Sequence, residues 1–290
     1  MTVQFSLKTL KFQLDEALDL NLDDFDLSQN QQHEFSARFV GVTLNTSFQP
    51  IYDIVKGDLH GYEAILRPSL CGIQESSAEF AYSYAKASNK LVKFDRLCRT
   101  LHVLNYQYVF NKNGLLFLSV HPDLLISVTE HGKVFERILH DYALPTEHIV
   151  IQIQDFMTTE QYENSAIYER KLNDAIRNYH DRGYKIAIEN FGNKQSLLNR
   201  LWKIQPDYLK FDPNLITEAS GNASLLKVLS HLSALANDIG TMPIITGIHH
   251  KEQFETATSL GAQCLQGDYL GIPSNTSKLK AAQQFKFDTL

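Results

Sequence analysis

The sequence predicts an α/β fold, namely a single (β/α)8 barrel of the TIM type, in which strands and helices alternate around a closed sheet. Three observations support this fold class. The chain has 290 residues, which is enough for one such barrel of about 250 residues. Short apolar, β-branched runs alternate with helical patterns at intervals of about 25–40 residues. Polar residues follow several of these runs, at the strand ends where parallel α/β folds build their sites.

Composition narrows the class of protein further. Hydrophobic residues make up 43% and charged residues 21% of the chain, which is typical of a globular protein. The net charge of −6 argues against a general nucleic-acid surface, so we expect no DNA or RNA partner. Cys71, Cys98 and Cys264 are isolated, which indicates neither a disulfide framework nor a zinc knuckle. We see no secretory signal and no apolar run that could span a bilayer, and we expect a cytoplasmic protein without a membrane partner.

Residues 1–36 differ from the rest and are expected to form an acidic N-terminal extension, with the main domain over residues 37–290. No Lys or Arg occurs between Gln13 and Arg38, and acidic residues from Asp15 to Asp26 are interleaved with Leu and Phe. We favour an ordered extension packed on the domain, because charge runs are usually solvated faces. The alternative is a docking segment for a basic partner.

The first two strands are expected at Thr46–Val55 and Leu59–Arg67. The tight polar turn Lys56-Gly57-Asp58 joins them, so they should form an antiparallel hairpin. A standard barrel begins with a parallel unit, and an antiparallel first strand is therefore a predicted departure. Ala78–Leu104 is predicted to form two helices, broken near Ser88-Asn89-Lys90.

The best-defined unit is the stretch from Tyr184 to Asp212, which predicts strand, helix and strand with the two strands parallel. Its helix is expected to carry apolar residues at helical spacing: Leu197, Leu198, Leu201 and Trp202. Before this unit we expect strands at Leu115–Val120 and Ile149–Ile153 and a helix containing Tyr162, Ile167, Leu172 and Ile176. After it we expect a helix at Ala223–Ile239, a strand at Pro243–Ile248, a helix at Glu252–Leu260 and a strand at Ala262–Gln266.

The order of the strand-end motifs resembles the EAL-domain family of cyclic di-GMP phosphodiesterases. The family motifs stand here as Gln49-Pro50-Ile51, Glu63-Ala64-Ile65, Glu189-Asn190-Phe191-Gly192, Lys210 with Asp212, Thr246-Gly247-Ile248-His249, and Gln266-Gly267 with Pro273. The resemblance covers about residues 40–275. It implies a TIM barrel with an antiparallel first strand, in agreement with the predicted hairpin.

The resemblance also implies a two-metal site for phosphodiester hydrolysis, and Mg²⁺ or Mn²⁺ needs carboxylate ligands there. Of five family carboxylate positions, Glu63 and Glu189 keep a carboxylate. Neutral side chains occupy the other three carboxylate positions, Gln152, Asn190 and Thr246, and Ser119 stands where the family has an Asn. Two carboxylates balance two divalent ions poorly, so we expect no resident metal or cofactor. Mg²⁺ or Mn²⁺ would matter only for residual activity, with Glu63 and Glu189 as candidate ligands of one ion.

Two residues match the family's catalytic positions, namely Glu63 and Lys210, which in the family helps to position the attacking water. His249 and His250 are alternative candidates for metal ligands, but surface or capping roles are commoner for such residues and are favoured for both. The loop residues Asn193-Lys194 depart from the small-Gly step of the family loop that couples metal occupancy to the dimer interface.

The nucleotide-contact positions of the family are better retained. They are Gln49, Glu63, Leu66, Arg67, Pro68, Asp95, Lys210, Gln266 and Pro273. The Arg67 guanidinium suits a phosphate, and Asp95 matches a position that contacts guanine in some family members. The alternative for Arg67 and Asp95 is a structural ion pair.

These residues favour a catalytically degenerate signalling protein, most simply a metal-independent cyclic di-GMP receptor that acts through an unidentified protein partner. The alternatives are an interaction module that binds no nucleotide and a residual cyclic di-GMP phosphodiesterase. No companion signalling domain fits in the remaining 36 residues, so we expect output through a separate chain. We also expect a homodimer through Leu197, Leu201 and the helix at Ala223–Ile239.

Overall fold

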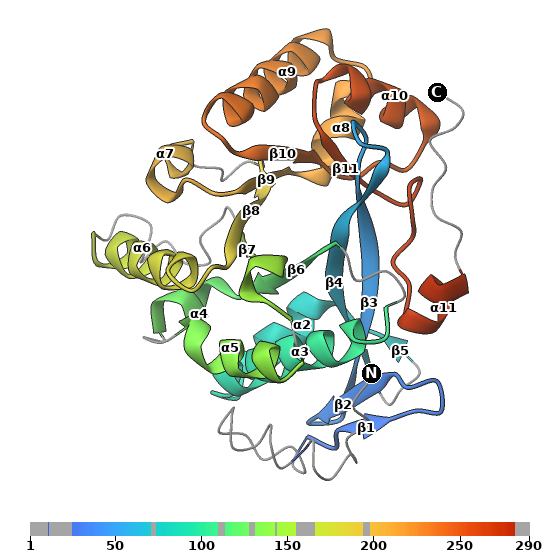
Figure 1. The fold of residues 1–290 in the computed structure, drawn as a ribbon, viewed down its shortest axis with the longest axis vertical. Helices are drawn as coiled ribbons and strands as arrows, with labels where there is room; N and C mark the ends of the chain where they lie inside the picture. The colour runs from blue at the N-terminus through green and yellow to red at the C-terminus, as the bar shows by residue number, and fades with distance from the viewer. Residues whose placement is uncertain are drawn as a thin grey trace.

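Eight strands form a closed barrel in the computed structural model (Figure 1). The structure describes Lys11 and residues 25–70, 74–109, 114–127, 131–142, 144–154, 166–193 and 198–281. The barrel strands are β3 (Val42–Asp53), β4 (Asp58–Leu70), β6 (Leu115–Val120), β7 (Ile149–Gln154), β8 (Lys185–Phe191), β9 (Tyr208–Phe211), β10 (Met242–Ile245) and β11 (Cys264–Gln266). The sheet closes because β3 pairs with both β4 and β11. The predicted fold class is therefore confirmed.

Strand β3 runs antiparallel to both of its barrel neighbours, as the hairpin predicted. The other barrel pairings are parallel. Within the turn, the Asp53 carboxylate accepts hydrogen bonds from the amides of Val55 and Lys56, both at 3.0 Å, and Gly57 adopts a positive φ of 69°. Because β3 is reversed, its carboxyl end lies beside the amino ends of β4 and β11.

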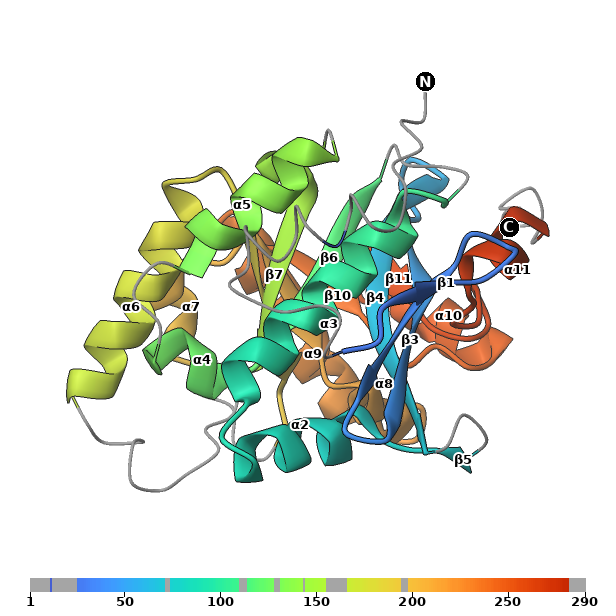
Figure 2. The ribbon, with the colours of Figure 1, turned by 90° about the horizontal axis from the view of Figure 1, so that it is seen from below.

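Helices surround the sheet (Figure 2). They are α2 (Ala78–Ala87), α3 (Leu91–Tyr106), α4 (Pro122–Ser127), α5 (His131–Asp141), the 3-10 turn η1 (Thr146–His148), α6 (Ala166–His180), α7 (Arg200–Ile204), α8 (Pro213–Ala219), α9 (Ala223–Asp238), α10 (Lys251–Ser259) and α11 (Thr276–Ala281). The predicted break between α2 and α3 is confirmed, and Asn89 takes a left-handed φ of 54° there.

Helix α7 is shorter than the sequence predicted and buries a different set of side chains. Leu201 and Ile204 are buried, whereas Leu198 is 49% and Trp202 63% exposed. Trp202 lies in the helix as predicted, whereas Leu198 precedes its first residue, Arg200, and the prediction is wrong at that position. A helix of a little more than one turn covers the sheet with only one or two side chains. Leu197 lies outside the described residues.

Strand β10 ends at Ile245, three residues earlier than predicted. Gly247 takes a positive φ of 77°, and a Cβ at this position would lie 2.4 Å from the Pro213 carbonyl oxygen. The chain turns away from the sheet at Gly247. Only glycine combines this positive φ with so close an approach to the Pro213 backbone, because it has no Cβ.

Three short strands were not predicted: β1 (Ser28–Gln29), β2 (Phe35–Phe39) and β5 (Gln74–Glu75). Strands β1 and β2 extend the sheet beyond β3, and Phe25 and Leu27 beside them are buried. The Asn105 side chain holds β2 in place, because it exchanges two hydrogen bonds with the Phe35 backbone at 2.8 and 2.9 Å. The described part of the acidic extension thus packs on the barrel. Most of its acidic residues lie outside the described residues, and the boundary at residue 36 stays a prediction.

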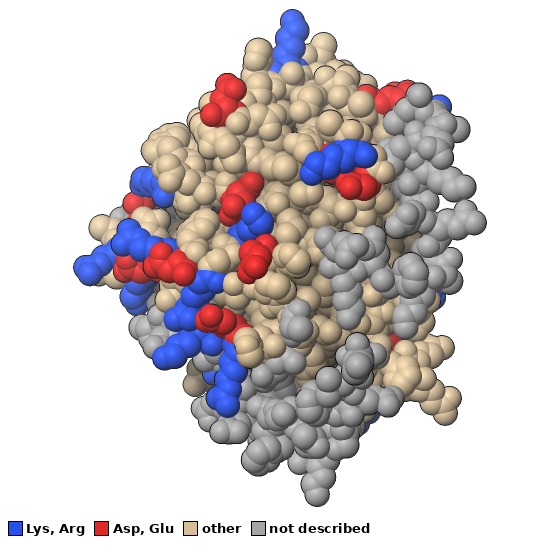
Figure 3. Space-filling model, viewed as in Figure 1, with Lys and Arg blue, Asp and Glu red and all other residues tan. Residues whose placement is uncertain are grey.

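Charged side chains of both signs lie interspersed on the face shown in Figure 3, mostly on the side of α6. This distribution differs from the single-sign surface that nucleic-acid binding requires. Within the described part of the chain, no helix combines the length and apolar character that a bilayer crossing needs.

Candidate functional site

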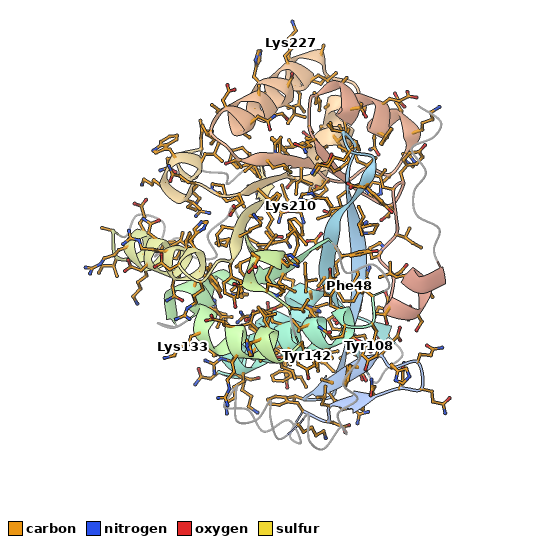
Figure 4. The ribbon with its side chains drawn as sticks, in the orientation of Figure 1. Phe48, Tyr108, Lys133, Tyr142, Lys210 and Lys227 are labelled. Atoms are coloured by element: carbon orange, nitrogen blue, oxygen red, sulfur yellow. The ribbon has the colours of Figure 1, made fainter. Side chains whose placement is uncertain are left out.

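Lys210 lies at the centre of the barrel, at the carboxyl end of β9 (Figure 4). Its side chain is only 5% exposed. The ammonium Nζ lies 2.9 Å from Glu63 Oε1 and donates a hydrogen bond to Gln152 Oε1 at 2.7 Å. These three residues come from β9, β4 and β7, because strands that run parallel in a barrel bring their carboxyl ends to one mouth.

Gln152 links the other members of this group. Its Nε2 donates to Glu63 Oε1 at 2.9 Å and to Ser119 Oγ at 3.0 Å. The side chain is fully buried, and its hydrogen bonds offset the cost of burying an amide. A glutamine can accept from Lys210 and donate to Glu63 at the same time, whereas an ionised glutamate can only accept. The neutral side chain therefore supports a connected network.

Glu63 is held as an anion. Oε1 accepts from Lys210 and Gln152, and Oε2 accepts from Gln266 Nε2 at 2.5 Å. Burial by itself raises the pKa of Glu63, but the Lys210 charge and the hydrogen bonds from Gln152 and Gln266 bring the pKa below its ordinary value.

Glu189 is the second carboxylate of the site, and its pKa is shifted in the opposite direction to that of Glu63. It is 8% exposed, and Ser119 Oγ donates a long hydrogen bond of 3.4 Å to its Oε2. Burial raises the pKa of Glu189 to about 7, and the neighbouring Glu63 charge adds to this, although Lys210 opposes it. Near neutral pH this group therefore exchanges its proton, while Glu63 stays ionised.

A cavity of about 350 Å³ opens at this mouth. Its lining comes from the strand ends and the loops after them: Gln49, Glu63, Glu189, Asn190, Lys210, Phe211, Pro213, Thr246, Gly247, His249, Gln266, Gly267, Asp268 and Pro273. Five of the nine expected nucleotide contacts are among them, namely Gln49, Glu63, Lys210, Gln266 and Pro273. The volume lies in the range of small-molecule sites, about 300–1,000 Å³.

Comparison with known protein families matches residues 29–273 to the EAL domain. The chain belongs to the EAL domain family. It is 28% identical over 221 residues to the cyclic di-GMP phosphodiesterase TpdA of Vibrio parahaemolyticus, covering 76% of this chain and 35% of TpdA. It is 29% identical over 165 residues to the EAL-domain protein YkuI of Bacillus subtilis, covering 56% of this chain and 38% of YkuI. The chain thus spans less than half the length of these curated relatives.

The fold also matches the solved EAL domain of FimX from Pseudomonas aeruginosa bound to cyclic di-GMP. The TM-score is 0.68 at 20% sequence identity, over 84% of this chain and 93% of that one. At this identity the likeness establishes a shared fold.

The remaining expected contacts of this EAL domain lie outside the cavity lining. Leu66 and Pro68 are buried in β4, and the exposed Arg67 between them donates from Nε to Ser47 Oγ at 3.0 Å. Asp95 is buried on α3, where its Oδ2 lies 2.7 Å from Arg99, and it accepts a hydrogen bond from Tyr82. The geometry favours the structural ion pair as the role of Asp95. The Arg67 guanidinium is instead bonded to the Ser47 hydroxyl, which is a neutral partner.

The other changed positions of the EAL domain are also engaged. Thr246 donates its hydroxyl proton to the Phe211 carbonyl at 2.7 Å, which ties the end of β10 to β9. Asn190 lines the cavity with a left-handed φ of 59°. Among the metal positions that the sequence predicts at this mouth, Glu63 and Glu189 are the two carboxylates, and they could hold a cation there.

Asp268 is a cavity residue that the sequence reasoning missed. Its carboxylate accepts from Gln49 Nε2 at 3.0 Å and lies 3.4 Å from His249 Nδ1. Its position directly after the Gln266-Gly267 motif, at a strand end, was the available signal. The amides of His249 and His250 both donate to Gln253 Oε1 at the start of α10, so this stretch begins a helix.

Proposed function

We propose that this EAL domain binds cyclic di-GMP without a metal ion and passes the signal to a protein partner. We further propose that it does not hydrolyse the ligand at ordinary enzyme rates. The single observation that carries the proposal is the position of Lys210, whose ammonium group is paired with Glu63 at 2.9 Å in the centre of the site.

The charges around Lys210 explain why a two-metal centre fits poorly. Two divalent ions held about 3.5–4 Å apart need several bridging anions, and the metal positions offer only Glu63 and Glu189. Both Glu63 oxygens already accept hydrogen bonds. A divalent ion would have to displace these donors. The proposed function therefore includes no metal-dependent step.

The same arrangement suits an anionic ligand. Lys210 balances Glu63, and the pKa of about 7 leaves Glu189 partly neutral at physiological pH. Replacement of carboxylates by Gln152 and Asn190 removes charge that would repel phosphate groups. The solved FimX EAL domain in complex with cyclic di-GMP supports this class of ligand for the present domain.

The cavity wall also offers groups for recognition of a base. Gln266 Nε2 donates to Glu63 and Gln49, while its Oε1 is buried and accepts no hydrogen bond from the described residues. A buried acceptor without a donor is unfavourable, and an N–H group of a bound guanine would satisfy it. Arg67 lies outside the cavity lining, exposed on β4, where its guanidinium is available to a phosphate group.

Calorimetric titration with cyclic di-GMP tests the proposal. The full chain is titrated in EDTA and again with excess Mg²⁺ or Mn²⁺, and the products are separated by chromatography. We expect dissociation constants that agree within about threefold and no linear dinucleotide. Failure to bind at high micromolar ligand in EDTA would exclude the receptor function. Metal-dependent turnover that Glu63→Ala abolishes would instead establish a residual phosphodiesterase, which would use Mg²⁺ or Mn²⁺.

Exposed apolar side chains support the protein partner and the homodimer. Helix α9 exposes Val228, Leu235 and Ile239, and Leu198 and Trp202 are exposed near α7. Leu201 was expected in the dimer contact, but it is buried in the core. We propose that the α9 surface pairs with a second copy or with the signalling partner. Sedimentation of the protein at tens of micromolar tests this, and a monomer with or without ligand would contradict the homodimer.

An interaction module without a nucleotide ligand is the second candidate, and the same exposed apolar residues favour it. This function would lead if calorimetry detects no cyclic di-GMP binding. The acidic segment from Asp15 to Asp26 was its expected contact, and most of that segment lies outside the described residues. We place the protein in the cytoplasm, because Cys98 and Cys264 are free thiols and a reducing compartment keeps thiols free.

A further inference from the structure

A second group of potential ligands lies at the end of the barrel opposite the cavity. Asp53, His60 and Cys264 each offer one ligand atom, and these atoms all lie within 4.8 Å of one another. Asp53 is the last residue of β3, His60 is near the start of β4 and Cys264 opens β11. Asp53 and Cys264 are directly paired across the two strands. The reversed direction of β3 is what brings its carboxylate to this end.

Asp53 is held firmly and keeps capacity for a cation. It is fully buried. Oδ1 accepts from the amides of Val55 and Lys56, and Oδ2 accepts from Gln263 Nε2 at 2.7 Å. Because a carboxylate offers about four lone-pair sites, Oδ2 retains one. The Lys56 ammonium lies 3.5 Å from Oδ2, but its side chain is 64% exposed and can move into solvent.

His60 is oriented by a neighbouring hydroxyl. Its Nε2 lies 3.2 Å from the Tyr208 hydroxyl, and the two rings meet edge to face at 5.4 Å. Among the described residues, Nδ1 has no hydrogen-bond partner. Burial lowers the pKa of His60, and this favours the neutral imidazole, which is the form that binds metals. A second partner that fixes the ring is the usual support of a metal-binding histidine.

Cys264 is fully buried at the centre of the group, and its Sγ lies 3.5 Å from Met242 Sδ. The buried thiol lies beside the Asp53 carboxylate, to which Cys264 is paired across the two strands. A metal ion would remove the thiol proton and neutralise the charge of both groups.

We propose that Asp53, His60 and Cys264 bind one Zn²⁺ ion, and that this ion clips the reversed strand β3 to its neighbours β4 and β11. Thiolate, imidazole and carboxylate together select a borderline-soft ion of the zinc type, whereas Mg²⁺ prefers oxygen ligands only. In a tetrahedron at zinc distances these atoms lie about 3.3–3.8 Å apart. The required contraction is at most about 1.5 Å and is within reach of side-chain rotation at His60 and Cys264.

The competing explanation is purely structural. In it, Asp53 caps the β3–β4 turn, and Cys264 and Met242 only fill the barrel end. Both explanations predict that Cys264 matters for stability, so stability alone does not separate them. Metal binding through sulfur does separate them, because a thiolate ligand to Co²⁺ gives an intense near-ultraviolet charge-transfer band.

The test is a titration of metal-free, tag-free full chain with Co²⁺, followed by Zn²⁺. We expect a thiolate-to-cobalt band that saturates at one ion per chain and disappears when Zn²⁺ is added. Cys264→Ser should abolish the band. His60→Gln, at a partly exposed position, should weaken Co²⁺ binding at least about tenfold. This variant tests the site if Cys264→Ser fails to fold. Cys98→Ser and Cys71→Ser are the matched controls and should leave the band unchanged.

Absence of a thiolate band in the folded protein would overturn the proposal, and so would a band that survives Cys264→Ser. A thermal scan provides the second readout. Zn²⁺ should raise the melting temperature of the parent protein and of Cys98→Ser by several degrees, and raise that of His60→Gln clearly less at the same Zn²⁺ concentration. An equal Zn²⁺ effect in His60→Gln would also contradict the assignment.

Discussion

Glu189 gives the sharpest test of the electrostatics of the cavity. Its pKa is raised from an ordinary 4.5 to about 7, mainly by burial. Below pH 4.5 the carboxyl group is protonated in both the folded and the unfolded chain, so it makes no difference to stability. Between pH 4.5 and 7 the unfolded chain loses the proton while the folded chain retains it. The free energy of unfolding therefore falls as the pH rises through this window.

Replacement of Glu189 by glutamine should remove this pH dependence, because glutamine is a neutral side chain of the same shape. A shift of about 2.5 pKa units corresponds to about 3 kcal/mol. We expect Glu189→Gln to unfold with a free energy up to about 3 kcal/mol higher than the parent at pH 8, and with an equal free energy near pH 4.5.

Urea unfolding followed by far-ultraviolet circular dichroism measures this difference at a series of pH values. The only tryptophan, Trp202, is 63% exposed and is a poor probe of the core. Glu218→Gln, at an exposed position on α8, is the matched control and should show no comparable trend. A difference between Glu189→Gln and parent that stays constant from pH 5 to pH 8 would refute the assigned pKa and the burial argument behind it.

Two further predictions concern the proposed ligand and the ion pair. Arg67→Ala should weaken cyclic di-GMP binding at least about tenfold in EDTA, because a charge-assisted hydrogen bond contributes about 1.5–3 kcal/mol. Calorimetry measures the affinity of both proteins. Equal affinities would show that Arg67 does not contact the ligand. Arg170→Ala, on the exposed face of α6, is its control. Lys210→Met should lower the free energy of unfolding by about 3–5 kcal/mol at pH 8, since it leaves Glu63 buried without its cation. Adding Glu63→Gln should restore much of that loss in urea unfolding, and a fully additive double variant would show that the pair is not coupled.

The strand order and the antiparallel first strand could be predicted from sequence because they depend on local patterns. A tight turn between two β-forming runs dictates a hairpin, and apolar runs followed by polar residues locate strand ends. The barrel topology alone predicted that Glu63, Gln152 and Lys210 meet at one mouth, because each lies near the carboxyl end of a parallel strand. Strands β1, β2 and β5 were missed because they are two to five residues long and take their order from neighbouring strands.

By itself, the sequence determined the barrel, the mouth at which the polar strand ends meet and the neutral side chains that stand there, since these are properties of residue type and strand direction. Only the tertiary structure decided the partners. Asp95 belongs to Arg99 and not to the cavity, Lys210 fills the space between Glu63 and Gln152, and Glu189 keeps a proton near neutral pH. Asp53 and Cys264 meet although 211 positions separate them in the chain. Distances and burial set these pairings and pKa values, and both arise when distant strands close the barrel.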